Sequence, residues 1–285
     1  MTTLAIDVGG SKFTVAGFTN ETLLLRETRR TDRSGGPEWM FSQIEQIFAD
    51  WRTQHAFEPA CCGIGFGGPV DFPFQTVTLS THVEGWSKYP LVANVERLIG
   101  APAVMDNDAN VAALGESVYG AGRGVNPLFY MTLSTGIGGG ILIDGQIYRG
   151  ADSFAGEIGH LNVLPEGPEC LCGSRGCLER MCCGLWLERD YGRPAEQLLT
   201  EPDFVKRYVV NLARGLKAAI MLLNPARVVI GGGISKAGDR LFGPLREELD
   251  RQMTAWSRAR REVVAAQYPD DCVLYGALAL ANQHL

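Results

Sequence analysis

One histidine and three cysteines in the second half of the chain could bind a metal ion. His160, Cys170, Cys172 and Cys177 follow the spacing His-x9-Cys-x-Cys-x4-Cys. An imidazole and three thiolates form the ligand set of a tetrahedral zinc site that leaves no coordination position open for a substrate. We therefore predict a structural zinc ion here. The alternative is a glycine-rich loop that carries reduced cysteines.

Two glutamates flank this cluster. Glu157 precedes the histidine by three residues, and Glu179 follows the last cysteine by two. A zinc ion bound to the loop would hold both carboxylates in one place, where they could accept hydrogen bonds from sugar hydroxyls. Taken one at a time, each glutamate could equally be a solvated surface carboxylate.

A second polar group lies at the expected end of a strand. Asp106-Asn107-Asp108 follows an apolar strand over 103–105 and precedes an expected helix over about 109–119. Asp108 could be the helix N-cap. It could instead be the general base that takes a proton from a substrate hydroxyl beside a phosphate site. Ligands of α/β sheets bind at the carboxyl ends of strands, and this position favours the base. Asn107 would then orient another hydroxyl.

Three glycine-rich turns follow apolar strands and could present backbone N–H groups to a phosphate. They lie at Gly9-Gly10, at Gly136 to Gly140 and at Gly231 to Gly233. A single turn of this kind usually only reverses the chain. The first two turns, however, occupy matching places, because each half of the chain begins with a strand, a glycine-rich turn and a second strand. Neither a Rossmann fingerprint nor a Walker A loop matches. The pattern indicates a nucleotide cleft between two lobes.

Two charged residues lie beside the first of these turns. Asp7 ends the first expected strand, where its carboxylate could hold Mg²⁺ near the phosphates or simply stabilise the turn. Lys12 could contact a phosphate or be a solvated surface lysine.

Strands and helices alternate along the chain, which indicates an α/β fold. Apolar periodicity predicts strands at 4–8, 13–18, 62–66, 103–105, 128–133 and 227–230, a hairpin around Asp144-Gly145, and helices at 40–51, 109–119, 204–223 and about 239–256. We expect two lobes. The first is residues 1–108, completed by a C-terminal helix at 272–285, and the second is residues 109–271, with the zinc loop at 160–179.

Composition narrows the class of protein. The 285 residues are 46% hydrophobic and 20% charged, as in ordinary globular proteins. A net charge of −6 argues against non-specific nucleic-acid binding, which needs a basic surface. The N-terminus shows no signal-peptide pattern, and the most apolar stretch, 218–234, is interrupted by polar residues and proline. We therefore expect a cytoplasmic protein without a membrane span. Its other cysteines should be buried thiols rather than disulfides.

Taken together, the motifs resemble those of the ROK family of sugar kinases and sugar-responsive repressors, and the resemblance covers essentially the whole chain. The segments that carry it are residues 7–12 (DVGGSK), 67–71 (GGPVD), 106–110 (DNDAN), 135–140 (TGIGGG), 156–160 (GEIGH) and 170–179 (CLCGSRGCLE). The last segment is the most specific.

The resemblance implies an actin-like, hexokinase-type two-lobe ATPase fold with ATP and the acceptor sugar in the cleft. It implies that Asp108 is the catalytic base. The implied sugar-binding residues are Gly68, Asn107, Asp108, Glu157, His160 and Glu179. The implied nucleotide-binding residues are Asp7, Gly9, Gly10, Lys12, Thr135, Gly136, Gly232 and Gly233. His160 would bind zinc through one ring nitrogen and face the sugar with the other.

Two stretches depart from the family pattern. Residues 79–86 keep the Gly85-Trp86 pair but lack the Pro-Asn-Leu that usually precedes it. Ser134 occupies a position where glycine is common in the phosphate turn. The first departure lies in the sugar-facing connection, so we expect it to affect the choice of hexose more than the chemistry.

The predicted function is ATP- and Mg²⁺-dependent phosphorylation of a hexose at the 6-hydroxyl, with glucose as the first candidate. One alternative is a kinase for another sugar, such as fructose, N-acetylglucosamine or N-acetylmannosamine. Two others are a sugar-sensing repressor and a non-catalytic or chaperone-like ATPase of the same fold. Repressors carry a helix-turn-helix module ahead of the kinase-like body, and with the first strand at Leu4 we expect none here. The resemblance also implies a homodimer.

Overall fold

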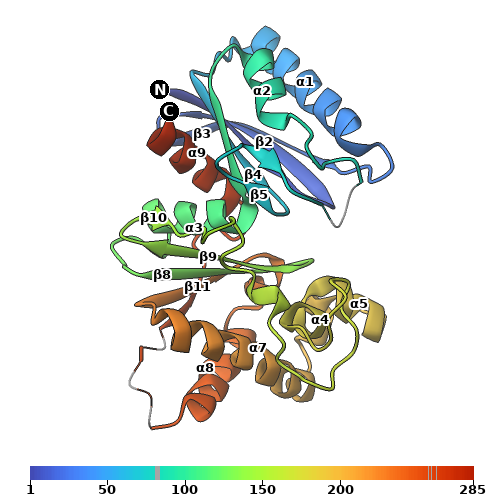
Figure 1. Ribbon diagram of the computed structural model, residues 1–285, viewed down its shortest axis with the longest axis vertical. Helices are drawn as coiled ribbons and strands as arrows, with labels where there is room; N and C mark the ends of the chain where they lie inside the picture. Colours follow the sequence, from blue (N-terminus) through green and yellow to red (C-terminus); the bar gives the residue numbers. More distant parts are fainter. Residues whose placement is uncertain (81–83, 256, 258, 261) are drawn as a thin grey trace.

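A computed structural model describes residues 1–80, 84–255, 257, 259–260 and 262–285. It contains two five-stranded sheets, one in each half of the elongated molecule (Figure 1). The strand order is β3-β2-β1-β4-β7 in the first sheet and β10-β9-β8-β11-β12 in the second. The strands are β1 (Thr2–Val8), β2 (Lys12–Thr19), β3 (Thr22–Arg30), β4 (Cys61–Phe66), β7 (Ala103–Asn107), β8 (Leu128–Leu133), β9 (Ile137–Ile143), β10 (Gln146–Ile147), β11 (Arg227–Gly231) and β12 (Val263–Ala265), with a separate hairpin of β5 (Val70–Asp71) and β6 (Thr76–Val77).

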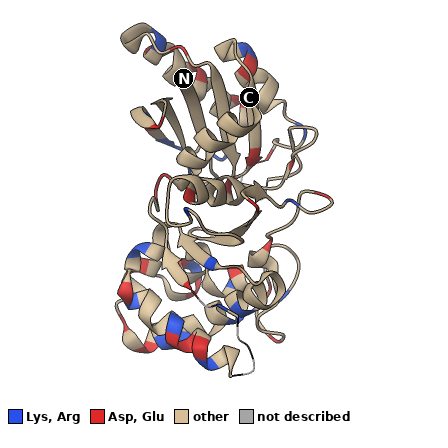
Figure 2. Cartoon of the chain, turned by 90° about the vertical axis from the view of Figure 1, so that its left-hand side faces the viewer, with Lys and Arg blue, Asp and Glu red and all other residues tan. Residues whose placement is uncertain are grey.

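The helices lie on both faces of each sheet, and α3 packs against both sheets. They are α1 (Gly36–His55), α2 (Leu91–Ile99), α3 (Asp108–Val118), α4 (Leu178–Cys182), α5 (Gly184–Tyr191), α6 (Ala195–Leu198), α7 (Pro202–Leu223), α8 (Asp239–Met253) and α9 (Cys272–His284), with 3-10 turns η1 (Ile158–His160) and η2 (Gly233–Ala237). Figure 2 shows charges of both signs interspersed over the outer helices of the second half. Within the described residues, no helix combines the length and the apolar character that crossing a membrane would require.

The two sheets repeat one topology. In the first, β1 pairs antiparallel with β2 and parallel with β4, and β4 continues parallel to β7. In the second, β8 pairs antiparallel with β9 and parallel with β11, and β11 continues parallel to β12. The α/β fold and the echo between the two halves that the sequence predicts are therefore confirmed.

Alternating side chains of β1 explain how the first sheet is covered. Leu4 and Ile6 are fully buried in a cluster with residues of α1 and α2. Ala5, on the other face, is buried in a cluster with residues of α3 and α9. The small side chain of Ala5 lets these two helices approach the sheet closely, and α3 also packs on β8 and β9 of the second sheet. Helix α3 is thus the element shared by both halves, as Figure 1 shows.

Most predicted elements are present, with shifts of a few residues at their ends. Helix α8 ends at Met253, and the end predicted at 256 lies outside the described residues. The short helices α2, α4, α5 and α6 were not predicted. Gly138 to Gly140, predicted to belong to a phosphate turn, lie inside strand β9 instead. A Cβ on Gly140 would collide with the Ala109 carbonyl and with the Ala113 side chain. Gly138 and Gly140 therefore serve the close packing of β9 on α3, whereas Gly139 faces the Gly156 carbonyl and the Phe129 ring.

Helix α9 also depends on a glycine contact. A Cβ on Gly276 would overlap the Val111 carbonyl of α3. Because both atoms belong to packed backbone, Gly276→Ala should lower the free energy of unfolding by about 1–3 kcal/mol, measured by denaturant unfolding.

Gly243→Ala is the matched control, because Gly243 also lies within a helix but has no atom within 4 Å of the added Cβ. This substitution should be neutral or slightly stabilising. Equal effects of the two substitutions would contradict the packing role of Gly276.

Candidate functional site

Asn107 and Asp108 join the end of β7 to the start of α3. The Asn107 Oδ1 accepts hydrogen bonds from the backbone N–H groups of Ala109 at 3.0 Å and Asn110 at 3.3 Å, so Asn107 is the N-cap. The Asp108 Oδ1 accepts from Ala109 at 2.8 Å. The capping role that the sequence allowed for Asp108 therefore belongs mainly to Asn107. The Asp108 Oδ2 is directed toward Gly67, 3.6 Å from where a Cβ on that glycine would lie.

The amide of Asn107 is already engaged within the protein. Its Nδ2 donates to the Gly68 carbonyl at 3.0 Å, while its Oδ1 caps α3. Gly68, predicted as a sugar-binding residue, therefore lies beside the predicted base. The contact fixes the Asn107 side chain rather than leaving it free to rotate.

Three carboxylates of the site influence one another. Burial raises the pKa of Asp108 to about 6, the Ala109 N–H opposes this rise, and Glu157 adds to it. Burial, and then the charge of Asp108, raise the pKa of Asp7 to about 7, while Lys12 lowers it. Burial also raises the pKa of Glu157. Asp7, Asp108 and Glu157 thus lie within electrostatic reach, although they come from three distant segments.

The first glycine turn joins β1 to β2 as predicted. A Cβ on Gly9 would lie 2.5 Å from the Lys12 carbonyl, so glycine is required for this tight turn. Two side chains beyond β3 hold it from outside. Thr31 Oγ1 donates to the Gly9 carbonyl at 2.8 Å, and Arg33 Nε donates to the Gly10 carbonyl at 3.0 Å. Neither residue was singled out from the sequence, because no local motif marks it.

The second turn is shorter than predicted and comprises Ser134, Thr135 and Gly136. Ser134 N–H donates to the Gly136 carbonyl at 3.0 Å, and Gly184 N–H donates to the Ser134 carbonyl at 2.7 Å. These bonds connect the turn to the start of α5.

The third turn lies next to the second. Gly232 has φ +83°, and a Cβ there would meet the backbone of Leu133 at the end of β8. Gly233 opens the 3-10 turn η2, and a Cβ on it would meet no atom within 4 Å. Gly231 is buried within β11 and is not part of the exposed turn. The two turns of the second sheet therefore lie side by side at the carboxyl ends of β8 and β11.

The four predicted metal ligands come together. The ligand atoms of His160, Cys170, Cys172 and Cys177 all lie within 4.8 Å of one another. The Sγ atoms of Cys172 and Cys177 are 3.7 Å apart. Thiolates around a tetrahedral zinc ion, with zinc–sulfur bonds of about 2.3 Å, would lie about 3.8 Å apart. The donor set and its spacing therefore fit zinc.

Glu179 connects this cluster to the second glycine turn. Its Oε2 accepts a hydrogen bond from the Ile137 N–H at 2.9 Å. Its charge and that of His160 both act on Glu157. The predicted sugar-binding residues Glu157, His160 and Glu179 are therefore gathered in one region, and Glu157 acts on Asp108 from there. Residues 81–83 of the divergent sugar-facing stretch lie outside the described residues.

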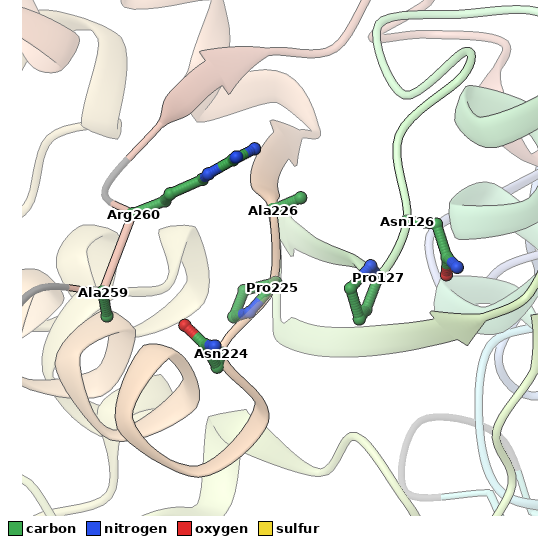
Figure 3. A pocket seen from close by; sticks show the side chains of 7 residues that line it. All are labelled: Asn126, Pro127, Asn224, Pro225, Ala226, Ala259 and Arg260. Carbon is green, nitrogen blue, oxygen red and sulfur yellow. The ribbon is translucent and has the colours of Figure 1, made fainter.

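A surface pocket lies away from this site. It has a volume of about 350 Å³ and is lined by Asn126, Pro127, Asn224, Pro225, Ala226, Ala259 and Arg260 (Figure 3). Pro127 and Ala226 immediately precede β8 and β11, whereas the glycine turns follow those strands. The pocket is therefore at the opposite end of the strands and contains none of the predicted site residues.

Comparisons with known proteins give a consistent result. The sequence model of the ROK family matches residues 3–284 of this chain. The chain is 31% identical to a glucokinase of Thermotoga maritima, covering 99% of this chain and 98% of the relative. It is 32% identical to a glucokinase of Streptomyces coelicolor, with the same coverage. A crystal structure of a ROK family glucokinase from Streptomyces griseus, in complex with glucose and AMPPNP, is 30% identical, with a TM-score of 0.85 over 99% of this chain and 100% of that one.

We expect Cys172→Ser to reduce the zinc content from about one ion per chain and to lower the melting temperature, because the substitution removes one of four ligands. Elemental analysis of protein purified without added metal measures the zinc content. Cys61→Ala, in the first sheet, should leave it unchanged. Absence of zinc from the unsubstituted protein would contradict the assignment.

Proposed function

Because the chain belongs to the ROK family, we propose that its candidate site phosphorylates a sugar at the expense of ATP, and that glucose is the sugar. The protein is a sugar kinase of the glucokinase type. The observation that carries this conclusion is the position of Asp108. Its half-buried carboxylate lies within electrostatic reach of Asp7, near the end of β1 and the first glycine turn, and of Glu157, which precedes the cysteine cluster.

Asp108 is the catalytic base. A pKa of about 6 leaves it ionised at neutral pH yet close enough to neutrality to accept a proton from a hydroxyl. The cap formed by Asn107 and the hydrogen bond from Ala109 fix the carboxylate through its Oδ1. Its Oδ2 is then the atom that takes the proton of the sugar 6-hydroxyl as the phosphoryl group is transferred.

Glu157, His160 and Glu179 form the sugar-binding wall. Glu179 uses one carboxylate oxygen for the Ile137 N–H, and the other can accept a hydrogen bond from a sugar hydroxyl. Glu157 is positioned next to both His160 and the base. Zinc, held by His160, Cys170, Cys172 and Cys177, would supply structural rigidity to this wall rather than chemistry.

The glycine turns bind the nucleotide. Gly9 and Gly10 are proposed to face the phosphates from the first sheet, and Thr135, Gly136, Gly232 and Gly233 from the second. Lys12, whose charge acts on Asp7, adds a positive charge there. Asp7 would hold Mg²⁺, which neutralises charge on the phosphates when bound. The raised pKa of Asp7 fits this role, because a carboxylate crowded by Asp108 is stabilised by a cation.

The remaining features of the proposal concern the whole molecule. Residues 1–108 with 272–285 form the first lobe, and residues 109–271 form the second. The partners are the hexose and ATP, and the chain acts as a homodimer in the cytoplasm without binding nucleic acid. The free cysteines and the acidic composition support a reducing compartment and the lack of nucleic-acid binding.

The choice of acceptor is tested by ADP release with glucose, mannose, fructose, N-acetylglucosamine and N-acetylmannosamine. We expect the highest kcat/KM with glucose. A higher value with an N-acetylhexosamine would reassign the substrate, and no sugar-dependent ADP release would contradict a kinase.

Asp108→Asn should lower kcat by about 10²–10⁴, because the amide cannot accept the proton. Its melting temperature at pH 7 should be equal to or above that of the unsubstituted protein, because a costly buried charge is removed. Asp152→Asn, at an exposed aspartate, is the control and should retain full activity. A near-normal kcat for Asp108→Asn would rule out the assigned base.

The pH dependence follows from the same carboxylate. Below a pH equal to its pKa of about 6 the base is protonated, so kcat/KM should fall about tenfold per pH unit on the acid side of that value.

The pH dependence of stability follows from the same raised pKa of Asp108. The folded state binds this proton more tightly than the unfolded chain, so Asp108 lowers stability progressively as the pH rises from about 4 to about 6, and by a constant amount above that. The stability advantage of Asp108→Asn should therefore be present at pH 7 and absent below about pH 4. An acid limb that stays flat to pH 5 would contradict the raised pKa.

A further inference from the structure

We propose that Arg149 is a positioning residue for the catalytic base and connects the second sheet to β7, the strand that directly precedes Asp108. The inference rests on the proposed function. It assigns a role to an arginine that belongs to none of the motifs described above.

The connection is a desolvated ion pair between the two halves of the molecule. Arg149 follows β10, the edge strand of the second sheet, and Asp106 lies in β7, the edge strand of the first. The Arg149 Nε is 2.7 Å from the Asp106 Oδ2. The side chains of Asp106 and Arg149 are only 2% and 18% exposed. At this burial the interaction is weakly screened by solvent, and the geometry is well defined.

The second oxygen of Asp106 acts on the residues around the base. Asp106 Oδ1 accepts a hydrogen bond from the Asn107 N–H at 2.7 Å and from the Asn110 Nδ2 at 3.1 Å. These two residues precede and follow Asp108 on the strand end and on the first turn of α3. One carboxylate therefore holds the backbone on both sides of the base, while its other oxygen is held by Arg149.

Surrounding contacts fix the guanidinium. It stacks over the Phe72 ring at 3.5 Å from the centroid, and the Phe72 N–H donates to Ser153 Oγ at 3.4 Å. Gln75, from the same hairpin as Phe72, donates to the Met105 carbonyl at 3.2 Å and accepts from its N–H at 2.6 Å. The hairpin that carries Phe72 is thus attached to β7 just before Asp106.

A purely structural role does not account for this arrangement. A buried ion pair contributes little net stability compared with apolar residues of similar volume. In addition, the buried Nη2 of Arg149 and Oδ1 of Asn110 have no hydrogen-bond partner within the described part of the chain. Such atoms carry a desolvation cost. The arrangement instead orients the base. Through the ion pair, the position of Asp108 follows the position of the second sheet, which carries the sugar-binding wall.

The test compares Arg149→Met and Arg149→Lys with the unsubstituted protein. Arg149→Met should lower kcat by about tenfold to a hundredfold, because a displacement of the base by about 1 Å has an effect of this size. The KM values for glucose and ATP should change by less than about threefold, and the zinc content should not change. Arg149→Lys, which keeps the charge but not the planar stacking, should be intermediate.

Arg246→Met is the matched control. Arg246 also lies over an aromatic ring, Phe242, at 5.5 Å, and its Nε donates to the Val263 carbonyl at 2.9 Å, on the far side of the second sheet. The substitution Arg246→Met should lower the melting temperature, but it should not lower kcat at a temperature where the protein is folded. A kcat loss in Arg246→Met as large as that in Arg149→Met would overturn the inference.

A double-mutant cycle separates the role from simple destabilisation. Asp106→Asn should reduce kcat as Arg149→Met does, and the double variant should show no further loss, because both act through one pair. Additive losses, or a kcat of Arg149→Met within twofold of the unsubstituted value, would refute the inference. If Arg149→Met does not fold, Arg149→Lys and Asp106→Asn provide the same comparison. An unsubstituted protein that phosphorylates no sugar would instead refute the proposed function.

Discussion

Negative charge held in a partly desolvated region is the constraint on which the site depends. Asp7 lies near the end of β1, Asp108 begins α3 and Glu157 directly precedes η1, and burial raises the pKa of each. Such a group of carboxylates is unstable unless cations or hydrogen-bond donors approach it. Lys12 and the Ala109 N–H provide part of this stabilisation within the chain. A phosphate-bound metal ion would provide more, which makes the same residues suited both to bind ATP·Mg²⁺ and to accept a proton.

Single hydrogen bonds connect the side chains of the site. Glu179 lies two residues beyond Cys177 of the metal-ligand cluster, and its carboxylate accepts a hydrogen bond from the Ile137 N–H directly after the second glycine turn. One side chain therefore connects the proposed sugar-binding wall to the proposed nucleotide turn. Asp106 makes a similar connection at the end of β7, where its carboxylate joins Arg149 to Asn107 and to Asn110 in the first turn of α3.

The sequence was sufficient for those features that are local or carried by motifs. The α/β class, the long helices and the grouping of His160, Cys170, Cys172 and Cys177 followed from periodicity and spacing. The N-cap was assigned less well, since both Asn107 and Asp108 are good capping residues and only the backbone geometry distinguishes them. The run from Gly138 to Gly140 suggested a turn because the helix that packs against it is not visible in the local sequence. Arg149 and Asp106 are 43 residues apart and belong to different sheets, so no spacing pattern could associate them.

The position of α9 has a consequence for biosynthesis. This helix packs against β1 and β4, which are among the first strands to leave the ribosome, and it covers the face to which Ala5 belongs. During translation α3 can cover part of that face, but the part that α9 covers stays open until α9 has been made. The nascent first sheet therefore leaves part of its apolar surface uncovered between the synthesis of β4 and that of α9, a period in which chaperone binding competes with aggregation. Soluble yield in a cell should then depend on the length of that interval.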